Sequence, residues 1–200
     1  NISGSFMSTG VNAFLLHLGG GTAVAAYGIV MYLDSLLLMA LYGILDSLQP
    51  PVSYNIGAGN HQKAREFFRL SCKVTAAISL VCLLAMVCFP RELASLFLQE
   101  NSEEVLEMTV TALRLFAPAY LFLWLNMVIS SFLTAMDRAR DSLTIMLFRA
   151  LIFPSICLAI FPQILDVTGI FITPAISGAL TVIISTTIWR RLGKQQPQEA

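Results

Sequence analysis

The stretch from Tyr27 to Arg69 reads YGIVMYLDSLLLMALYGILDSLQPPVSYNIGAGNHQKAREFFR, and it decides the fold. It opens as a long apolar helix that carries two carboxylates, Asp34 and Asp46, at depths where lipid is expected. A charged side chain at the centre of a bilayer costs about 2.5–3.5 kcal/mol or more, and such residues mark ion or substrate routes. The helix is predicted to end at Gln-Pro-Pro (49–51), before a polar loop and a basic segment. We therefore look for function first on this helix.

The composition is that of an integral membrane protein. Hydrophobic residues make up 56% of the 200 residues and charged residues 12%, with a mean hydropathy of +0.75. Soluble domains carry about 25% charged residues. The formal net charge of zero argues against a nucleic-acid partner. The four cysteines lie in apolar segments without a CxxC pair, so we expect small packing residues rather than a metal site or a disulfide framework.

Six segments are long and apolar enough for transmembrane helices: 1–18, 22–48, 70–89, 105–136, 143–161 and 169–189. Three glycines at 19–21 break the first from the second. Residues 91–98 read as a short surface helix, and Asn101 as the cap of the next one. The predicted fold class is an all-α integral membrane protein, with one six-helix lobe over 1–193 and a cytoplasmic tail over 194–200. Because the chain opens inside an apolar segment, we expect the first helix to be truncated and the numbering to begin within a longer polypeptide.

The basic residues are distributed unevenly between the predicted loops. Nine of the twelve fall after the second helix, after the fourth and after the sixth, namely Lys63, Arg65, Arg69, Lys73, Arg138, Arg140, Arg190, Arg191 and Lys194. The opposite side has only Arg91, which is surrounded by glutamates. Because cytoplasmic loops carry an excess of lysine and arginine, we place these basic loops and the C-terminus in the cytoplasm.

Two further arginines, Arg114 and Arg149, lie inside predicted helices. Depths calculated from the helical rise permit two ion pairs, Asp34 with Arg114 and Asp46 with Arg149. Such pairs can simply fix helix packing. Alternatively, the mid-membrane Asp34 is a functional carboxylate that binds and releases a proton or Na⁺.

Other polar residues fall on defined helix faces. One stripe on the second helix contains Tyr42, Asp46, Gln49 and Ser53, and another contains Tyr27 and Asp34. Both are expected to face protein or water. Asn126, in the fourth helix, is expected either to line a cavity or to bond across helices, while Ser177, Thr181 and Ser185, spaced by four, indicate close helix packing. Pro118 and Pro154 are expected to kink their helices.

The run from Gly43 to Asn60 resembles the G-x-x-x-x-x-Q-P-x-x-S-x-N-x-G-A signature of the multidrug and toxic compound extrusion (MATE) family. The matching motif residues are Gln49, Pro50, Ser53, Asn55, Gly57 and Ala58. Segments 18–28, 90–97, 111–118 and 149–177 are also similar to family patterns, in the same order. The chain looks closest to the bacterial MepA-like branch.

The resemblance implies the C-terminal half, helices seven to twelve, of a two-lobed secondary transporter in the bacterial inner membrane. Such a protein exports cationic or amphipathic drugs by H⁺ or Na⁺ antiport with alternating access, and it needs an N-terminal lobe as partner. It implies no cofactor beyond the coupling ion. Some branches place an acid in the first and fourth helices of this lobe, and here neither apolar core has one. The residue that binds the coupling ion is then expected either in the other lobe or at Asp34.

Three alternatives remain open at this stage. The cargo could be a lipid-linked sugar, which a related flippase would move across the membrane. The chain could also be a structural half-protein without transport of its own. A membrane enzyme is disfavoured, because the predicted helices contain no nucleophile–base pair and no metal cluster. The sequence names neither the drug nor the ion.

Overall fold

The computed structural model describes the backbone of residues 2–98 and 103–195, and the side chains of 9–98 and 103–192. Over these residues every regular element is helical. The elements are α1 (Ile2–Gly57), α2 (His61–Cys88), α3 (Pro90–Ser95), α4 (Glu103–Phe116), η1 (Ala117–Ala119), α5 (Tyr120–Ala135), α6 (Ala139–Leu147), η2 (Phe148–Ile152), α7 (Phe153–Ile160) and α8 (Pro162–Gln195). The predicted cap Asn101 and most of the predicted tail lie outside the described residues.

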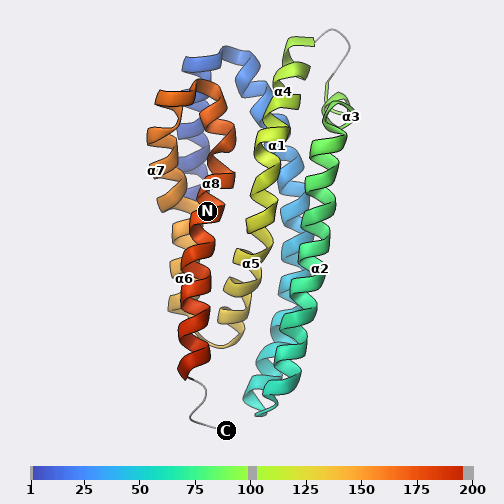
Figure 1. Ribbon diagram of the computed structural model, residues 1–200, viewed down its shortest axis with the longest axis vertical. Helices are drawn as coiled ribbons and strands as arrows, with labels where there is room; N and C mark the ends of the chain where they lie inside the picture. Colours follow the sequence, from blue (N-terminus) through green and yellow to red (C-terminus); the bar gives the residue numbers. More distant parts are fainter. Residues whose placement is uncertain (1, 99–102, 196–200) are drawn as a thin grey trace.

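The first two predicted spans are the two arms of α1. Gly20 interrupts the helix with φ +63° and ψ −160°, a conformation that glycine adopts at little cost. Figure 1 shows α1 reaching one end of the bundle, turning there and running back to the other end. Five helical segments are apolar and long enough to cross a membrane, and the first of them, Thr9–Gly57, contains this bend. The predicted break at 19–21 is therefore confirmed.

The predicted end of this helix at the Gln-Pro-Pro sequence is wrong. Pro50 and Pro51 lie inside α1, which continues to Gly57. Each proline removes one N–H donor, but its fixed φ suits a helix, and the bonds on either side hold the turns together. The polar segment that was expected to be a loop is therefore largely the last turns of α1.

A tight turn then joins α1 to α2. Gly59, with φ +74°, donates its N–H to Ile56 O at 3.0 Å, and Asn60 donates to Asn55 O at 2.8 Å. This is the Schellman arrangement, in which a left-handed residue closes the helix end. The Asn60 side chain accepts from Lys63 N at 3.2 Å and so caps α2.

In two of the membrane-spanning segments the α-helix is interrupted by a turn of another helix type, in each case close to a proline. Pro118 lies in the 3₁₀ turn η1 between α4 and α5, while Pro154 lies in the first turn of α7, after the π-helical turn η2. Single π-turns inside α-helices occur often at functional sites. The helical hydrogen-bond pattern therefore changes beside both prolines, and Arg149 lies in the second of these turns, while a kink at either proline stays a prediction.

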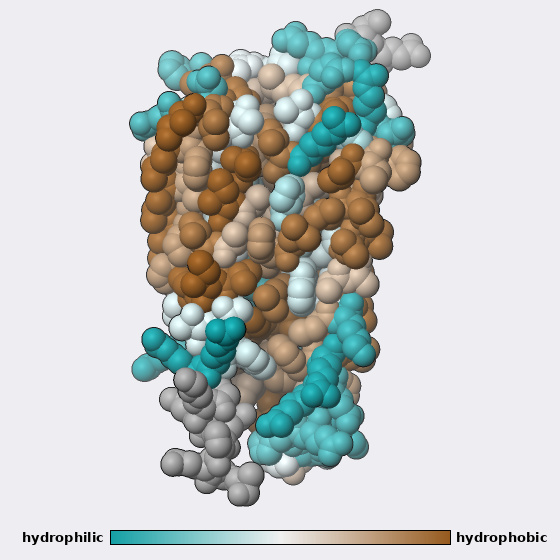
Figure 2. All heavy atoms as spheres, viewed as in Figure 1, coloured by the Kyte–Doolittle hydropathy of each residue, from teal (hydrophilic) through white to brown (hydrophobic). Residues whose placement is uncertain are grey.

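The predicted alternation of loops is present in the fold. The α1–α2 turn, the α5–α6 turn and the C-terminal end of α8 lie at one end of the bundle, while the α1 bend, α3 and the α7–α8 turn lie at the other (Figure 1). On the face drawn in Figure 2, hydrophilic residues gather at the two ends and a hydrophobic band lies between them. The chain is therefore built as a multi-pass membrane protein; which end faces the cytoplasm stays a prediction.

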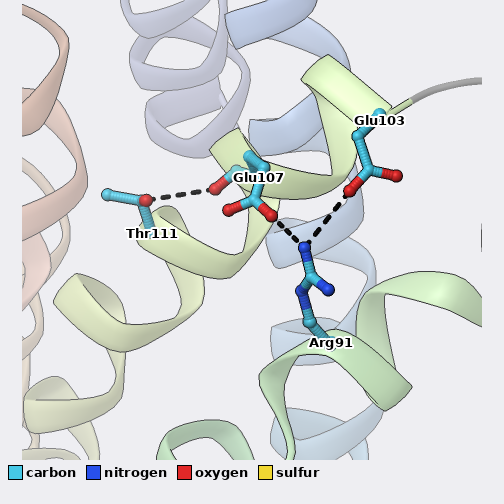
Figure 3. A network of polar contacts seen from close by, with 4 residues as sticks. All are labelled: Arg91, Glu103, Glu107 and Thr111. Carbon is cyan, nitrogen blue, oxygen red and sulfur yellow. Dashed lines mark hydrogen bonds and ion pairs between the residues drawn. The ribbon is translucent and has the colours of Figure 1, made fainter.

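The short helix predicted after the third span is present as α3. Its Arg91 forms ion pairs with Glu103, at 3.2 Å, and with Glu107 on α4 (Figure 3). The hydrogen bond and charge of Glu107, followed by the charge of Glu103, raise the pKa of Arg91 above its ordinary value. These contacts tie α3 to the start of α4 at the rim of the bundle.

The core lies where α1, α2, α4, α5 and α8 meet, and Leu15, Val30, Leu41, Leu113 and Ile170 are buried in it. The packing prediction for the cysteines holds for Cys157, which is buried, and for Cys72 and Cys82, which pack on this core. It is wrong for Cys88, which is the last residue of α2 and is exposed there.

Candidate functional site

A cavity of about 400 Å³, here called the upper cavity, lies between α1, the α4–α5 crossing, η2, α7 and α8. Its volume is in the range of small-molecule sites, about 300–1,000 Å³. Four of the residues predicted to bind ion or substrate line it: Tyr27, Asp34, Asn126 and Arg149. The remaining wall is mostly apolar and aromatic, from Met31, Leu38, Phe116, Tyr120, Leu123 and Leu158. The fold thus brings together residues from three helices that are far apart in the sequence.

Asp34 is a half-buried carboxylate with one side-chain partner. The Tyr120 hydroxyl donates a hydrogen bond to Asp34 Oδ1 at 2.9 Å. Tyr120 is 1% exposed, so the bond lies in the interior of the bundle. A charge-assisted bond of this kind holds the carboxylate in place at the wall of the cavity.

The predicted ion pair between Asp34 and Arg114 is wrong. Arg114 is exposed on α4, and it lines neither of the two cavities described in this section. Depth in the membrane was the basis of that prediction, and depth says nothing of the direction in which a side chain leaves its helix. Tyr120, which follows Arg114 after the 3₁₀ turn in the same crossing, is the partner of Asp34 instead.

A second cavity of about 260 Å³, the lower cavity, lies closer to the α1–α2 and α5–α6 turns. Tyr42, Asp46 and Gln49 from the predicted stripe line it, facing Ser131 and Thr134 of α5. Gln49 Nε2 donates to Ser131 Oγ at 3.3 Å and lies 3.5 Å from Asp46 Oδ1. The fourth member of the stripe, Ser53, is exposed beyond this cavity.

Arg149 lines both cavities. It is part of the π-helical turn η2, and its Nη2 donates to the Tyr42 hydroxyl at 3.1 Å. The predicted ion pair with Asp46 is not formed, although the two side chains share the lower cavity. The ion pairs of Arg91 with Glu103 and Glu107, and of Arg138 with Asp141, lie at the ends of the bundle.

Asn126 lines the upper cavity and also forms hydrogen bonds to another helix. The sequence analysis left these two roles as alternatives, and the structure shows both. Its side chain is 1% exposed; Nδ2 donates to Gly178 O at 3.1 Å, and Oδ1 accepts from Ser185 Oγ at 2.7 Å. Ser177, Thr181 and Ser185 are all buried on α8, as predicted for close packing. Asn126 therefore fastens α5 to α8 beside the cavity.

The remaining motif residues build the end of α1. Asn55 Nδ2 donates to Pro51 O at 2.7 Å, Gly57 is the last residue of α1, and Ala58 begins the turn. They therefore shape the helix end, while Gln49 lines the lower cavity. Sequence reasoning missed Tyr120 as a polar partner. A tyrosine in an apolar helix is the available signal, but that signal does not say which side chain it meets.

The MatE family model matches residues 1–159. The chain is 29% identical over 182 residues to the FAD transporter of Shewanella oneidensis, an alignment that covers 91% of this chain and 40% of that protein. The chain thus spans less than half the length of this curated relative.

Solved transporter structures have the same fold, and this chain again covers less than half of each of their chains. A MOP superfamily transporter from Pyrococcus furiosus gives a TM-score of 0.87 at 19% identity, over all of this chain and 44% of that one. A Vibrio cholerae MATE transporter gives 0.81 at 22% identity, over 94% of this chain and 43% of that one. The family match together with this architecture shows that the chain belongs to the MatE family, whose members are membrane transporters and not enzymes, and that it has the fold of about half of such a transporter.

Proposed function

We propose that this chain is the C-terminal lobe of a two-lobed secondary transporter, which exports an organic solute from a bacterial cell by alternating access. Two lobes are supported by the lengths of the relatives. This chain covers 40% of the Shewanella oneidensis relative and 44% of the Pyrococcus furiosus transporter whose structure is solved. The order of the motif matches, from the Gln49–Ala58 signature onward, favours the C-terminal half and the MepA-like branch. The positive-inside rule favours basic turns on the cytoplasmic side.

One observation carries the proposal: a carboxylate, Asp34, lines a cavity within the membrane-spanning bundle and is held by a neutral donor, Tyr120, instead of a cation. No lysine or arginine nitrogen among the described side chains lies within 4.0 Å of it. Ionisable residues that face an internal cavity of a membrane protein mark proton relays and ion pathways. Asp34 is thus proposed as the group in this lobe that binds the coupling H⁺ or Na⁺.

The resemblance to multidrug exporters favours an organic cation as the cargo. Asp34 is the one acid among the residues that line the upper cavity. A bound organic cation and a coupling ion would then compete for the same negative charge. Such competition is the physical basis of antiport, because each ligand weakens the binding of the other.

A second candidate cargo is FAD, the solute in the name of the Shewanella oneidensis relative. The observation that favours it is Arg149, an arginine that lines both cavities without an acid at ion-pairing distance among the described residues. An anionic cargo would bind there instead of at Asp34. A lipid-linked sugar, which carries phosphate, would use the same arginine.

The test is transport by the intact two-lobed protein in proteoliposomes. A fluorescent lipophilic cation and FAD are loaded in separate experiments, and an H⁺ or a Na⁺ gradient is imposed alone. Wild type is compared with Asp34→Asn and with a matched control, Asp141→Asn, at the α5–α6 turn. We expect one gradient to drive uphill transport in wild type and in the control, and Asp34→Asn to abolish it.

Uphill transport at the wild-type rate in Asp34→Asn would place coupling in the other lobe and make Asp34 structural. If FAD moves and the cation does not, the second cargo is correct. If neither solute moves under either gradient, the proposal that the protein exports an organic cation or FAD is wrong. Lipid-linked sugars are then assayed in the same vesicles.

A further inference from the structure

Arg149 has hydrogen-bonding capacity that this lobe does not use. A guanidinium offers five N–H donors in a planar fork. Within the described residues its hydrogen-bond partner is the Tyr42 hydroxyl, at 3.1 Å, and no carboxylate oxygen lies within 4.0 Å. An arginine inside a membrane protein is normally paired with an acid or with backbone carbonyls. Arg149 therefore keeps N–H donors that an anionic ligand can use.

The position of Arg149 defines what that ligand looks like. On one side the upper cavity offers apolar and aromatic wall, including Tyr27, Phe116 and Tyr120. On the other side the lower cavity offers polar groups from Gln49 and Ser131, together with the carboxylate of Asp46, which an anionic group would have to avoid by lying on the Ser131 side of Arg149. A molecule that fills both has an aromatic ring system at one end and an anionic group near Arg149.

The chemistry at Arg149 favours phosphate as the anionic group. The planar fork of arginine matches phosphate oxygens in a bidentate arrangement. The Tyr42 hydroxyl accepts from Arg149 and so keeps its own O–H to donate to the same anion. The π-helical turn η2 presents Arg149 at the boundary of the two cavities, where both groups can be reached.

We propose that Arg149 binds the phosphate of a soluble aromatic phosphate ester, with the ring system of that solute in the upper cavity. This inference rests on the proposed export function with its second, anionic candidate cargo, and it names the chemical class of that cargo. It also assigns opposite effects to the two charges of the upper cavity. Arg149 attracts the phosphate, while the negative charge of Asp34 in the same cavity repels it.

The experiment is equilibrium binding of three flavins to the intact transporter in phosphatidylcholine nanodiscs. Riboflavin, FMN and FAD share one ring system and carry none, one and two phosphate groups. We expect FMN and FAD to bind wild type at least about tenfold more tightly than riboflavin, the scale of a charge-assisted contact. Arg149→Gln should remove this advantage and leave riboflavin binding intact, which shows that the variant is folded.

Three further variants test how the charges of Arg149 and Asp34 affect binding of the phosphate. Arg149→Lys keeps the charge without the fork and should retain part of the phosphate advantage. Arg114→Gln is the matched control, because Arg114 is exposed and lines neither cavity, and it should bind all three flavins as wild type does. Asp34→Asn removes the repelling charge and should tighten FMN binding several-fold.

The inference is wrong if Arg149→Gln keeps the phosphate advantage, if wild type binds riboflavin as tightly as FMN, or if no phosphate-bearing flavin binds. It is also wrong if phosphatidylglycerol in the nanodisc displaces FMN, because the anion at Arg149 is then a lipid headgroup. Gradient-driven export of the lipophilic cation in proteoliposomes is the separate readout for the proposed function. Export without flavin binding would overturn this inference alone.

Discussion

The Tyr120 hydroxyl donates a hydrogen bond of 2.9 Å to the Asp34 carboxylate, joining α5 to α1 across 86 residues of sequence. Tyr120→Phe removes the donor and keeps the ring. The carboxylate then loses a bond whose loss costs about 1.5–3 kcal/mol when a charged group is involved. We expect a lower unfolding midpoint for the detergent-solubilised protein. The matched control is Tyr32→Phe, because Tyr32 is exposed. Equal midpoints for the two variants would contradict a stabilising role of the bond.

Asp34 and Arg114 are predicted to be energetically independent. Their double-mutant cycle, built from Asp34→Asn and Arg114→Gln, should give an interaction energy within about 0.3–0.5 kcal/mol of zero, as for groups that share no partner. The same cycle with Asp34→Asn and Tyr120→Phe should give a clear interaction energy. Unfolding free energies of the four variants in each cycle provide the measurement. A larger energy in the first cycle than in the second would reverse this assignment.

Asn126 is predicted to hold α5 against α8 through both ends of its amide. Asn126→Leu has a similar volume but leaves Ser185 Oγ and Gly178 O without this partner. Interhelical hydrogen bonds in membrane proteins contribute on average about 0.6 kcal/mol each, with a maximum near about 1.7. We therefore expect a loss of about 1–3 kcal/mol in unfolding free energy. The control Asn12→Leu, at an exposed position on α1, should change it little.

Gly20 is predicted to be required for its backbone conformation and not for space. A Cβ at Gly20 would meet no atom within 4 Å, but φ is +63°. Gly20→Ala should cost about 1–3 kcal/mol in unfolding free energy, since essentially only glycine adopts a positive φ with ψ near 180°. Gly21 also has open space around its Cα, and its φ is not in that region. If Gly21→Ala is as destabilising as Gly20→Ala, the cost does not arise from the bend.

The orientation of the bundle is predicted from its basic turns. In a variant without the native cysteines, Gln62→Cys beside the α1–α2 turn and Leu96→Cys beside α3 place thiols at exposed positions near opposite ends. A membrane-impermeant maleimide added to intact cells should label the second and spare the first. Inverted membrane vesicles should give the reverse. Labelling of the thiol at position 62 in intact cells would invert the proposed topology.

The sequence by itself determined the membrane class, the crossings, the bend near Gly20 and the arrangement of basic turns at one end. These features follow from composition along the chain: apolar length decides what spans a bilayer, and charge decides what stays outside it. The same reading placed Asp34 and Arg149 inside the bundle. The predicted helix end at Pro50 was wrong, because α1 continues through Pro50 and Pro51. Hydrogen bonds in the neighbouring turns keep the helix intact although each proline lacks an N–H donor.

Only the tertiary structure decided which of these polar groups meet. The helical rise gives the depth of Asp34 and Arg114, but the rotation and neighbours of each helix come from packing between segments far apart in the chain. Packing turns Arg114 outward, brings Tyr120 to Asp34, and places Arg149 between two cavities and beside Tyr42. The π-helical turn that presents Arg149 likewise depends on how α6 and α7 join within the bundle. The candidate site is therefore a product of helix packing, because its residues come from helices whose mutual rotation no local pattern specifies.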